Sequence, residues 1–253
     1  MLDRIVEATR SRVADLRTRL ASVMEKAEAS PPPPSFERAI TRSDLAVIAE
    51  IKRRSPSRGD LALELEPAGL AKLYASGGAA ALSVLTEPEF FSGSAEDLVA
   101  ARNATGLPVL RKDFVVEAIQ IWEARAIGAS AILLIVAVLT PNELAALLDD
   151  AGRAEVDALV EVHSVEEARM AVDLGARLIG VNNRDLSTFE VDLATAEELA
   201  PVLTGMAATV AESGVLTRAD ALRMRAAGYD AVLVGEALVR SPDPAALIRE
   251  MRS

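Results

Sequence analysis

The chain of 253 residues contains no cysteine and a single histidine, His163. Without cysteine it can form no disulfide framework, no thiolate nucleophile and no thiolate metal site. With one histidine, a multi-histidine metal cage or a histidine-based proton relay has almost no groups to draw on. Lysine is also scarce, because 23 of the 27 basic residues are arginine. Acid–base chemistry must therefore rest on carboxylates and four lysines, which are Lys26, Lys52, Lys72 and Lys112.

Long apolar runs and an excess of positive charge are missing too. The most apolar stretch, residues 129–139, is far shorter than the roughly 20 residues that a membrane-spanning helix needs. The N-terminus alternates charged and apolar residues, so it lacks the core of a signal peptide. A net charge of −11 disfavours nucleic acid or an anionic membrane surface as partner. We therefore expect a soluble cytoplasmic protein that binds neither nucleic acid nor membranes.

The first 29 residues predict one amphipathic helix, because apolar residues recur in them at steps of three and four. The prolines of Pro31–Pro34 end this helix, since proline cannot continue a helix interior. A short segment, Ser35–Ile40, then leads into the main body of the chain. Residues 1–45 are thus expected to form a helical extension. The sequence leaves open whether this extension covers the base of the following domain or contacts substrate near its mouth.

From Leu45 onward, short apolar runs alternate with longer stretches of helical period, at the roughly 20–35-residue spacing of strand–helix units. The eight runs are Ala46–Ile51, Ala80–Leu85, Pro108–Leu110, Ala131–Ile135, Ala158–Val162, Leu178–Val181, Ala207–Ala211 and Ala231–Val234. Eight such units predict the α/β class and a (β/α)8 TIM barrel over residues 46–253, in a single structural domain overall. An open doubly wound sheet is less consistent, because the first run is followed by neither a glycine-rich fingerprint nor a phosphate-loop motif.

Polar side chains collect at the carboxyl ends of these runs, where barrels of this class carry their chemistry. Because side chains alternate along a strand, several of these groups can point into one mouth. They are Glu50, Lys52, Lys112, Glu161, Asn182 and Glu212. A carboxylate embedded in an apolar strand is costly unless it is paired, and lysine partners are available.

Two further features favour an anionic ligand. Ser213-Gly214 and Gly235-Glu236 follow the seventh and eighth runs, where many barrels bind phosphate through backbone N–H groups. The loop of residues 52–59 carries Arg53, Arg54 and Arg58 in an otherwise acidic protein. Its serine, proline and glycine content suits a mobile lid, and its arginines are expected to surround the mouth.

These motifs together resemble those of the indole-3-glycerol-phosphate synthase family, in order over residues 47–240. The motifs are Ala49-Glu50-Ile51-Lys52 with Ser55-Pro56-Ser57-Arg58-Gly59, Ser83-Val84-Leu85-Thr86-Glu87 with Phe90-Phe91-Ser92-Gly93-Ser94, Leu110-Arg111-Lys112-Asp113-Phe114, Val160-Glu161-Val162-His163, Gly180-Val181-Asn182-Asn183-Arg184, Ala211-Glu212-Ser213-Gly214 and Leu233-Val234-Gly235-Glu236. An N-terminal helical extension is also a feature of that family.

The resemblance implies a carboxy-lyase of tryptophan biosynthesis. In its reaction, 1-(2-carboxyphenylamino)-1-deoxyribulose 5-phosphate closes a ring and loses carbon dioxide and water to give indole-3-glycerol phosphate. It implies no cofactor and no metal, which agrees with the missing cysteine and scarce histidine. The implied partner is this small phosphorylated substrate, and association with other tryptophan-pathway enzymes is compatible with the resemblance.

By the same resemblance, Lys112 is the general acid that protonates the ketone, a role for which we expect burial to lower its pKa. Arginine could not serve, because it is effectively never deprotonated. Glu161 and Glu50 would handle the later proton transfers, and Lys52 would pair with the substrate carboxylate or phosphate. The other implied roles are a hydroxyl contact for Asn182, a supporting charge network for Arg184 and Glu212, ring packing for Phe91 and Phe114, and the phosphate end for Ser55, Ser213, Gly214, Gly235 and Glu236.

Two positions depart from the usual motif. Arg58 stands where lysine is common, which preserves the charge, and Glu236 stands where some relatives carry a small hydroxyl residue. An ionised Glu236 cannot donate to phosphate, so its backbone N–H is the expected contact. His163 is interpreted as structural. Alternatives are another phosphate-binding barrel enzyme, such as phosphoribosylanthranilate isomerase, or a non-catalytic barrel on the same scaffold; neither the division of proton-transfer roles nor the oligomeric state follows from the sequence.

Overall fold

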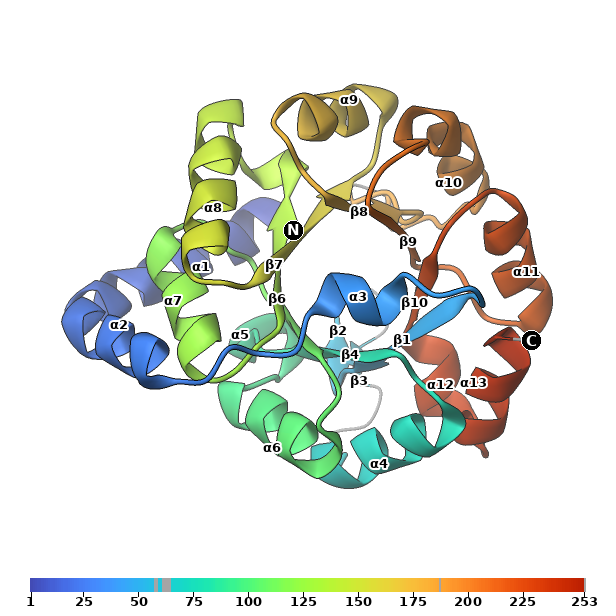
Figure 1. The fold of residues 1–253 in the computed structure, drawn as a ribbon, viewed down its shortest axis with the longest axis horizontal. Coiled ribbons are helices and arrows are strands. Elements are labelled where there is room, and N and C mark those ends of the chain that lie inside the picture. The colour runs from blue at the N-terminus through green and yellow to red at the C-terminus, as the bar shows by residue number, and fades with distance from the viewer. Residues whose placement is uncertain (57–58, 61–64, 187, 253) are drawn as a thin grey trace.

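Among the residues that the computed structural model describes (1–56, 59–60, 65–186 and 188–252), eight parallel strands close into a barrel (Figure 1). The ring runs β1, β4, β5, β6, β7, β8, β9, β10, and β10 pairs with β1 to complete it. The register of this last pair joins Ala46 to Ala231 and Ala49 to Val234. The predicted (β/α)8 fold is therefore confirmed, and an open doubly wound sheet is excluded.

Each barrel strand begins within one residue of a predicted apolar run. The strands are β1 (Ala46–Ile51), β4 (Ala81–Leu85), β5 (Val109–Lys112), β6 (Ala131–Ile135), β7 (Asp157–Val162), β8 (Leu178–Asn182), β9 (Ala208–Glu212) and β10 (Ala231–Val234). Three of them extend beyond the apolar run, because ladder hydrogen bonds join backbone groups and continue whatever the polarity of the side chain. Lys112, Asn182 and Glu212 are consequently the last residues of their strands.

Helices follow the strands and surround the barrel. They are α4 (Pro67–Gly77), α5 (Pro88–Phe91), α6 (Ala95–Thr105), α7 (Ala118–Ala126), α8 (Pro141–Arg153), α9 (Val165–Asp173), α10 (Ala194–Leu199), α11 (Arg218–Ala226), α12 (Glu236–Arg240) and α13 (Pro244–Arg252), with 3-10 turns η1 (Val136–Val138) and η2 (Ala200–Leu203). The loop after β1 contains a short antiparallel hairpin, β2 (Arg54–Ser55) and β3 (Gly59–Asp60), which the sequence pattern did not predict.

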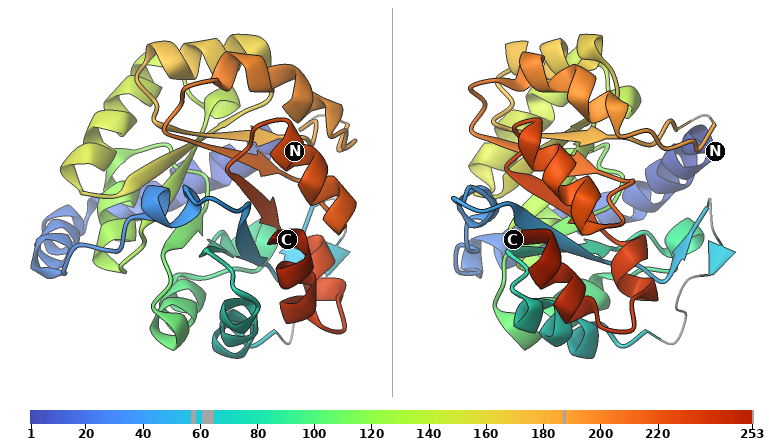
Figure 2. Two further views of the ribbon diagram at one scale, coloured as in Figure 1. Left: turned by 45° about the vertical axis from the view of Figure 1, so that its right-hand side comes forward. Right: turned by 90° about the vertical axis from the view of Figure 1, so that its right-hand side faces the viewer.

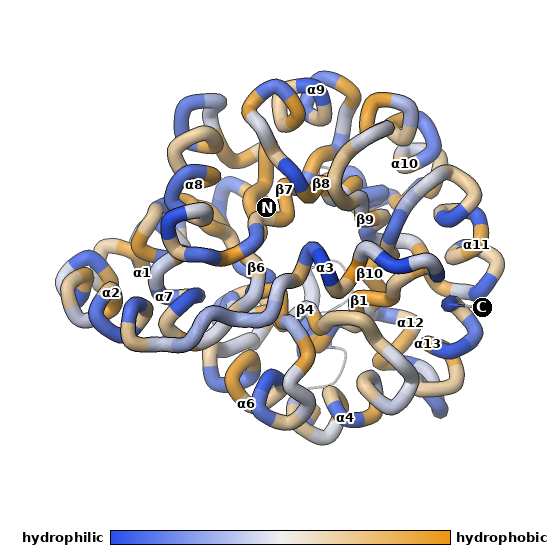
Figure 3. Tube along the Cα trace, in the orientation of Figure 1, coloured by the Kyte–Doolittle hydropathy of each residue, from blue (hydrophilic) through white to orange (hydrophobic). Residues whose placement is uncertain are grey.

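The core has two layers, because strand side chains alternate between the inside of the barrel and the helices. On β1, Val47 and Ala49 pack in the outer cluster, whereas Ala46 and Ile48 pack in the inner one. The strands form an apolar centre inside more polar helices (Figure 3). Within the described residues, no helix is both long and apolar enough to cross a membrane.

The first 29 residues form two helices, α1 (Leu2–Arg17) and α2 (Leu20–Ala29), so the prediction of one continuous helix is wrong. The chain turns at Thr18 and Arg19, where Arg19 has φ −113° and ψ 14°. Both helices pack against α7, which has nine residues. A straight helix of 28 residues would be about 42 Å long at 1.5 Å per residue, far too long to follow α7 throughout.

The N-terminal extension reaches both ends of the barrel. Helix α3 (Phe36–Ile40) closes the base, where Phe36 and Ile40 join the inner apolar cluster. Asp157, at the start of β7, accepts hydrogen bonds from the backbone N–H groups of Phe36 (2.8 Å) and Glu37 (2.9 Å). The N-terminus of α1 and the β2–β3 hairpin lie on the opposite side (Figure 2).

Candidate active site

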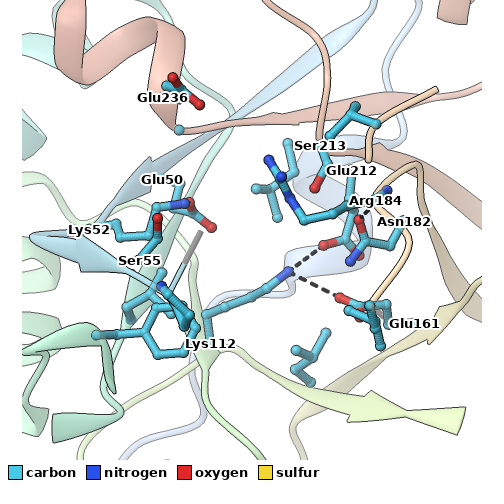
Figure 4. Close-up of a pocket in the computed structure, with 18 of the residues that line it drawn as sticks. Glu50, Lys52, Ser55, Lys112, Glu161, Asn182, Arg184, Glu212, Ser213 and Glu236 are labelled. Carbon is cyan, nitrogen blue, oxygen red and sulfur yellow. Dashed lines mark hydrogen bonds and ion pairs between the residues drawn. The ribbon is translucent and has the colours of Figure 1, made fainter. Parts of the chain in front are cut away.

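A cavity of about 390 Å³ opens where the barrel strands end. The residues that the sequence predicts to be catalytic or to bind substrate and phosphate line it: Glu50, Lys52, Ser55, Phe91, Lys112, Phe114, Glu161, Asn182, Arg184, Glu212, Ser213, Gly214, Gly235 and Glu236. Figure 4 shows Lys112 pointing toward Glu161 and Glu212, whereas Glu236 lies apart from them. Ser57 and Arg58 of the predicted loop motif lie outside the described residues.

Lys112 lies at the centre of the charged groups. Its Nζ donates to Glu212 and lies 3.4 Å from Oε2 of Glu161. Burial alone would lower the pKa of Lys112, but the negative charges of Glu212, Glu161 and Glu50 outweigh it and raise the pKa well above its ordinary value. The expectation of a burial-lowered pKa is therefore wrong, because three carboxylates surround the ammonium group. Lys112 is held as a cation.

Glu50 lies in β1, and Lys52 is the residue that follows this strand. The two side chains form a second ion pair on one face of the strand. Burial would raise the pKa of Glu50, but the charges of Lys52 and Lys112 hold it below its usual value. Gly235 packs directly on this carboxylate, since a Cβ added there would lie 2.4 Å from Oε1 of Glu50. Residue 235 must therefore be glycine for Glu50 to keep this position.

Glu212 is the most deeply placed carboxylate of the cavity, at 1 % exposed. Burial, together with repulsion from Glu161 and Glu50, raises the pKa of Glu212 to about 7 despite the attraction of Lys112. Gly180 makes room for it, because a Cβ there would lie 2.1 Å from Oε1 of Glu212. A carboxyl group with a raised pKa thus lies against the lysine.

Glu161 is flanked by His163, which is two residues further along the chain. Nε2 of His163 lies 3.4 Å from Oε1 of Glu161, and Nδ1 lies 3.4 Å from Oε2 of Glu167 on α9. Burial would lower the pKa of His163, but contact with Glu167 and the charges of Glu161, Glu167 and Glu212 raise it above 6.5. His163 therefore connects the cavity carboxylate to α9.

Asn182 and Arg184 are joined through the backbone after β8. Oδ1 of Asn182 accepts a hydrogen bond from the backbone N–H of Arg184 at 3.0 Å. The guanidinium of Arg184 donates to the carbonyl of Phe189 at 3.0 Å, which folds the loop after β8 back over the cavity. Arg184 thus contributes a positive charge to the lining.

Backbone groups form one end of the cavity. Ser213 and Gly214 have φ of 62° and 82°, and Gly235 precedes the first residue of α12, Glu236. The first N–H groups of a helix have no acceptor within the helix and can bind an anion. The Glu236 side chain lies 3.3 Å from Arg240, one helical turn away.

Two loop arginines do not face the cavity, so the prediction that they surround the mouth is wrong. Arg53 pairs with Asp97 of α6 and donates to the carbonyl of Leu65 at 3.0 Å. Arg54 pairs with Asp60 across the β2–β3 hairpin at 3.4 Å. Both arginines are therefore paired with carboxylates outside the cavity. Arg53 joins the start of the loop after β1 to Leu65, and Arg54 joins the two strands of the hairpin.

Phe91 and Phe114 form an apolar wall of the cavity. The rings of Phe91 and Phe114 lie 6.1 Å apart at an interplanar angle of 38°. Apolar residues that the sequence analysis did not select also line the cavity, among them Met1, Leu2, Ile5, Pro56, Leu85, Leu186, Phe189 and Val191. The amphipathic period of α1 placed Leu2 and Ile5 on its apolar face, but only the fold reveals that this face meets the mouth.

Comparison with known proteins gives a consistent result. The sequence profile described as indole-3-glycerol phosphate synthase matches residues 2–251. Curated relatives of that name include one from Mycolicibacterium smegmatis, 49% identical over 99% of this chain and 93% of its own length. Another, from Lactiplantibacillus plantarum, is 42% identical over 100% of this chain and 98% of its own length.

Solved structures with low sequence identity share the fold. Thiamine phosphate pyrophosphorylase from Pyrococcus furiosus superposes with a TM-score of 0.62 at 16% identity, over 86% of this chain and 96% of its own. A 3-hexulose-6-phosphate synthase also gives 0.62 at 16% identity, over 82% of this chain and 98% of its own. At this level of identity the likeness concerns the barrel alone.

Proposed function

The chain belongs to the indole-3-glycerol phosphate synthase family of tryptophan biosynthesis, and from this premise we propose how its cavity carries out the reaction as a carboxy-lyase. The substrate is 1-(2-carboxyphenylamino)-1-deoxyribulose 5-phosphate. A carbon–carbon bond forms between its aromatic ring and its ketone carbon. Carbon dioxide and then water leave, and indole-3-glycerol phosphate results.

Lys112 is the general acid of ring closure. It donates a proton to the ketone oxygen as the aromatic carbon attacks, so that no unprotonated alkoxide accumulates. The observation that carries this assignment is its position at the centre of the cavity, where its Nζ lies between Glu212 and Glu161. The proton that dehydration removes from carbon can pass through one of these carboxylates back to Lys112.

Glu161 and Glu50 act in the later steps. Loss of carbon dioxide restores the aromatic ring, and dehydration then needs one group to remove a proton and another to protonate the departing hydroxyl. Both carboxylates line the cavity on strands at either side of Lys112, and each is paired with a lysine. Asn182 orients a substrate hydroxyl, and Arg184 and Glu212 balance the charge around it.

The two ends of the cavity bind different parts of the substrate. Phe91 and Phe114 pack on the flat anthranilate ring, which aromatic side chains recognise through offset or tilted contacts. Ser55 and the backbone of Ser213, Gly214, Gly235 and Glu236 bind the phosphate, with Lys52 beside them. No cofactor or metal takes part in this proposal.

A turnover assay tests the proposal directly. The purified protein is mixed with the carboxyphenylamino-deoxyribulose phosphate, and the indole product is followed by its fluorescence. Turnover that depends on Lys112 and Glu161 supports the assignment. Activity with phosphoribosylanthranilate alone would instead support an isomerase, and inactivity with both substrates would indicate a non-catalytic barrel.

Three broader features complete the proposal. Residues 1–45 serve as an extension that folds onto the barrel of residues 46–253 as part of one domain. The protein works in the cytoplasm, where its small phosphorylated substrate is made. Contacts with other enzymes of tryptophan synthesis would shorten the path of that substrate, and co-purification of the tagged protein from its own cells checks this.

A further inference from the structure

One arginine of the N-terminal helix contacts two buried carboxylates from two different strand ends. Nη1 of Arg12 donates to Oε1 of Glu87 at 2.6 Å, and Nη2 lies 3.4 Å from Oδ1 of Asp113. Glu87 follows β4 and is fully buried, and Asp113 follows β5 and is 3 % exposed. Arg12 therefore bridges β4 and β5 from outside the barrel.

Each of these carboxylates also holds the backbone of an aromatic residue of the cavity. Oε2 of Glu87 accepts hydrogen bonds from the N–H groups of Phe90 (2.6 Å) and Phe91 (3.2 Å) and so caps α5. Oδ1 of Asp113 accepts from the N–H of Phe114 at 2.9 Å. The backbone of each aromatic residue of the apolar wall thus donates to a carboxylate that Arg12 binds.

The two contacts are not equivalent, because the carboxylates differ in their other partners. Asp113 also lies 3.3 Å from the guanidinium of Arg111 and accepts from the Thr86 hydroxyl at 2.7 Å. Among the described residues, Arg12 is the cation paired with Glu87. A buried carboxylate that loses its cation is strongly disfavoured, so α5 should respond to Arg12 more than the start of the β5 loop does.

The same helix face reaches the cavity directly. Ile5 precedes Arg12 by seven residues, which places both on one side of α1. Ile5 is 4 % exposed and lines the cavity, and the buried Thr9 between them contacts Arg12 at 3.3 Å. The position of α1, the cap of α5 and the ring of Phe91 are consequently linked through one side chain.

We propose that Arg12 is a positioning residue for the aromatic subsite: through Glu87 and Asp113 it fixes the rings of Phe91 and Phe114 against the substrate ring. This inference rests on the proposed placement of the anthranilate ring at that wall. The phosphate end and Lys112 are held by other contacts, so the effect falls on recognition of the aromatic part of the substrate.

Steady-state kinetics of Arg12→Met and Arg12→Lys test this, with inhibition by anthranilate and by inorganic phosphate measured in parallel. For Arg12→Met we expect KM and the anthranilate inhibition constant to rise about tenfold to a hundredfold, as small misplacements of binding groups do. The phosphate inhibition constant should stay at the wild-type value. Arg12→Lys keeps the charge and should recover part of the loss.

Arg17→Met is the matched control. Arg17 anchors the same helix through a two-point ion pair with Glu117 at the start of α7, and neither residue lines the cavity. We expect it to leave both inhibition constants unchanged. An equal effect of Arg17→Met, or an equal loss of phosphate affinity in Arg12→Met, would show that Arg12 merely anchors α1 and would overturn the proposal.

A double-mutant cycle with Glu87→Gln tests the route of the effect. If Arg12 acts through Glu87, Arg12→Met should change KM much less in the Glu87→Gln background than in the wild type. An equal change of KM in both backgrounds would refute this route. If Arg12→Met does not fold, the same cycle is measured with Arg12→Lys in place of Arg12→Met. Absence of turnover in the wild type would instead refute the proposed function, while anthranilate binding measured by calorimetry would still test Arg12.

Discussion

Lys112 and Glu212 form an ion pair across the mouth of the barrel, from strands β5 and β9 that lie opposite one another in the ring. Four strand positions separate them in either direction, so no local sequence relation brings them together. The pair places a carboxylate with a raised pKa against the lysine at the centre of the cavity. The chemistry of the site therefore depends on the closed barrel and not on any one loop.

Replacing Lys112 with methionine should abolish most of the turnover. Methionine has similar length but no proton to donate, and a positioned general acid contributes about 10²–10⁴-fold. Lys112→Arg should be almost as slow, because arginine keeps the charge but is effectively never deprotonated. Stopped-flow or steady-state fluorescence of the indole product measures both. Lys72→Met, at an exposed position of α4, is the control, and a fast Lys112→Met variant would refute the assignment.

Gly180→Ala should slow the reaction while leaving the barrel folded. The added methyl group would lie 2.1 Å from Oε1 of Glu212, so this carboxylate must move away from Lys112. We expect kcat to fall about 10²-fold, the typical cost of a misplaced catalytic group. Gly152→Ala on α8 meets no atom within 4 Å and should gain up to about 1 kcal/mol of stability with unchanged kcat. Wild-type kcat in Gly180→Ala would contradict the role of the Glu212 position.

His163 should make stability depend on pH in the neutral range. Its pKa is raised in the folded chain, so the stabilisation is fully present below the unfolded pKa of about 6.5 and is lost as pH rises through the folded value. Urea unfolding at pH 5.5, 7 and 8.5 should therefore show wild type losing stability relative to His163→Asn as pH increases. Glu167→Gln removes a main cause of the raised pKa and should reduce this difference. If the stability of the wild type relative to His163→Asn instead increased with pH, the prediction would be contradicted.

Asp157 should matter for stability but not for catalysis, because it caps α3 at the base of the barrel. Asp157→Ala leaves the N–H groups of Phe36 and Glu37 without this acceptor and should cost about 1 kcal/mol of unfolding free energy. Asp157→Asn keeps an oxygen acceptor and should cost less. Thermal unfolding and kcat are measured together. A fall in kcat at temperatures where the variant stays folded would show that the two ends of the barrel communicate.

Much of the barrel followed from local pattern alone. Eight apolar runs at regular intervals predicted the eight strands, and alternation along each strand placed Glu50 and Lys52 on one face. The extra residues of β5, β8 and β9 escaped prediction because side-chain polarity was used to end a strand, whereas the backbone ladder continues. The position of polar residues at strand ends therefore predicted the site well, whereas hydrophobicity predicted the exact strand ends less well.

Features that depend on distant contacts could not be predicted. The direction of the Lys112 pKa depends on three carboxylates from three other strands, and burial alone indicated the opposite. Arg53 and Arg54 looked like ligand-binding groups until their partners Asp97 and Asp60 were known. The place of α1 at the mouth is a matter of packing, which an amphipathic period does not specify.

The way the N-terminal segment is fastened has a consequence for synthesis on the ribosome. Its anchors include Arg12 with Glu87 and Asp113, the carbonyls of Ser30 and Pro31 with Arg125, and α3 with Asp157. The first 40 residues therefore emerge without their partners, and at about 5–20 residues per second the last anchor follows roughly 6–25 s later. Until α7 has been made, the apolar faces of α1 and α2 lack the helix against which they pack, and a nascent-chain chaperone has its best opportunity to bind.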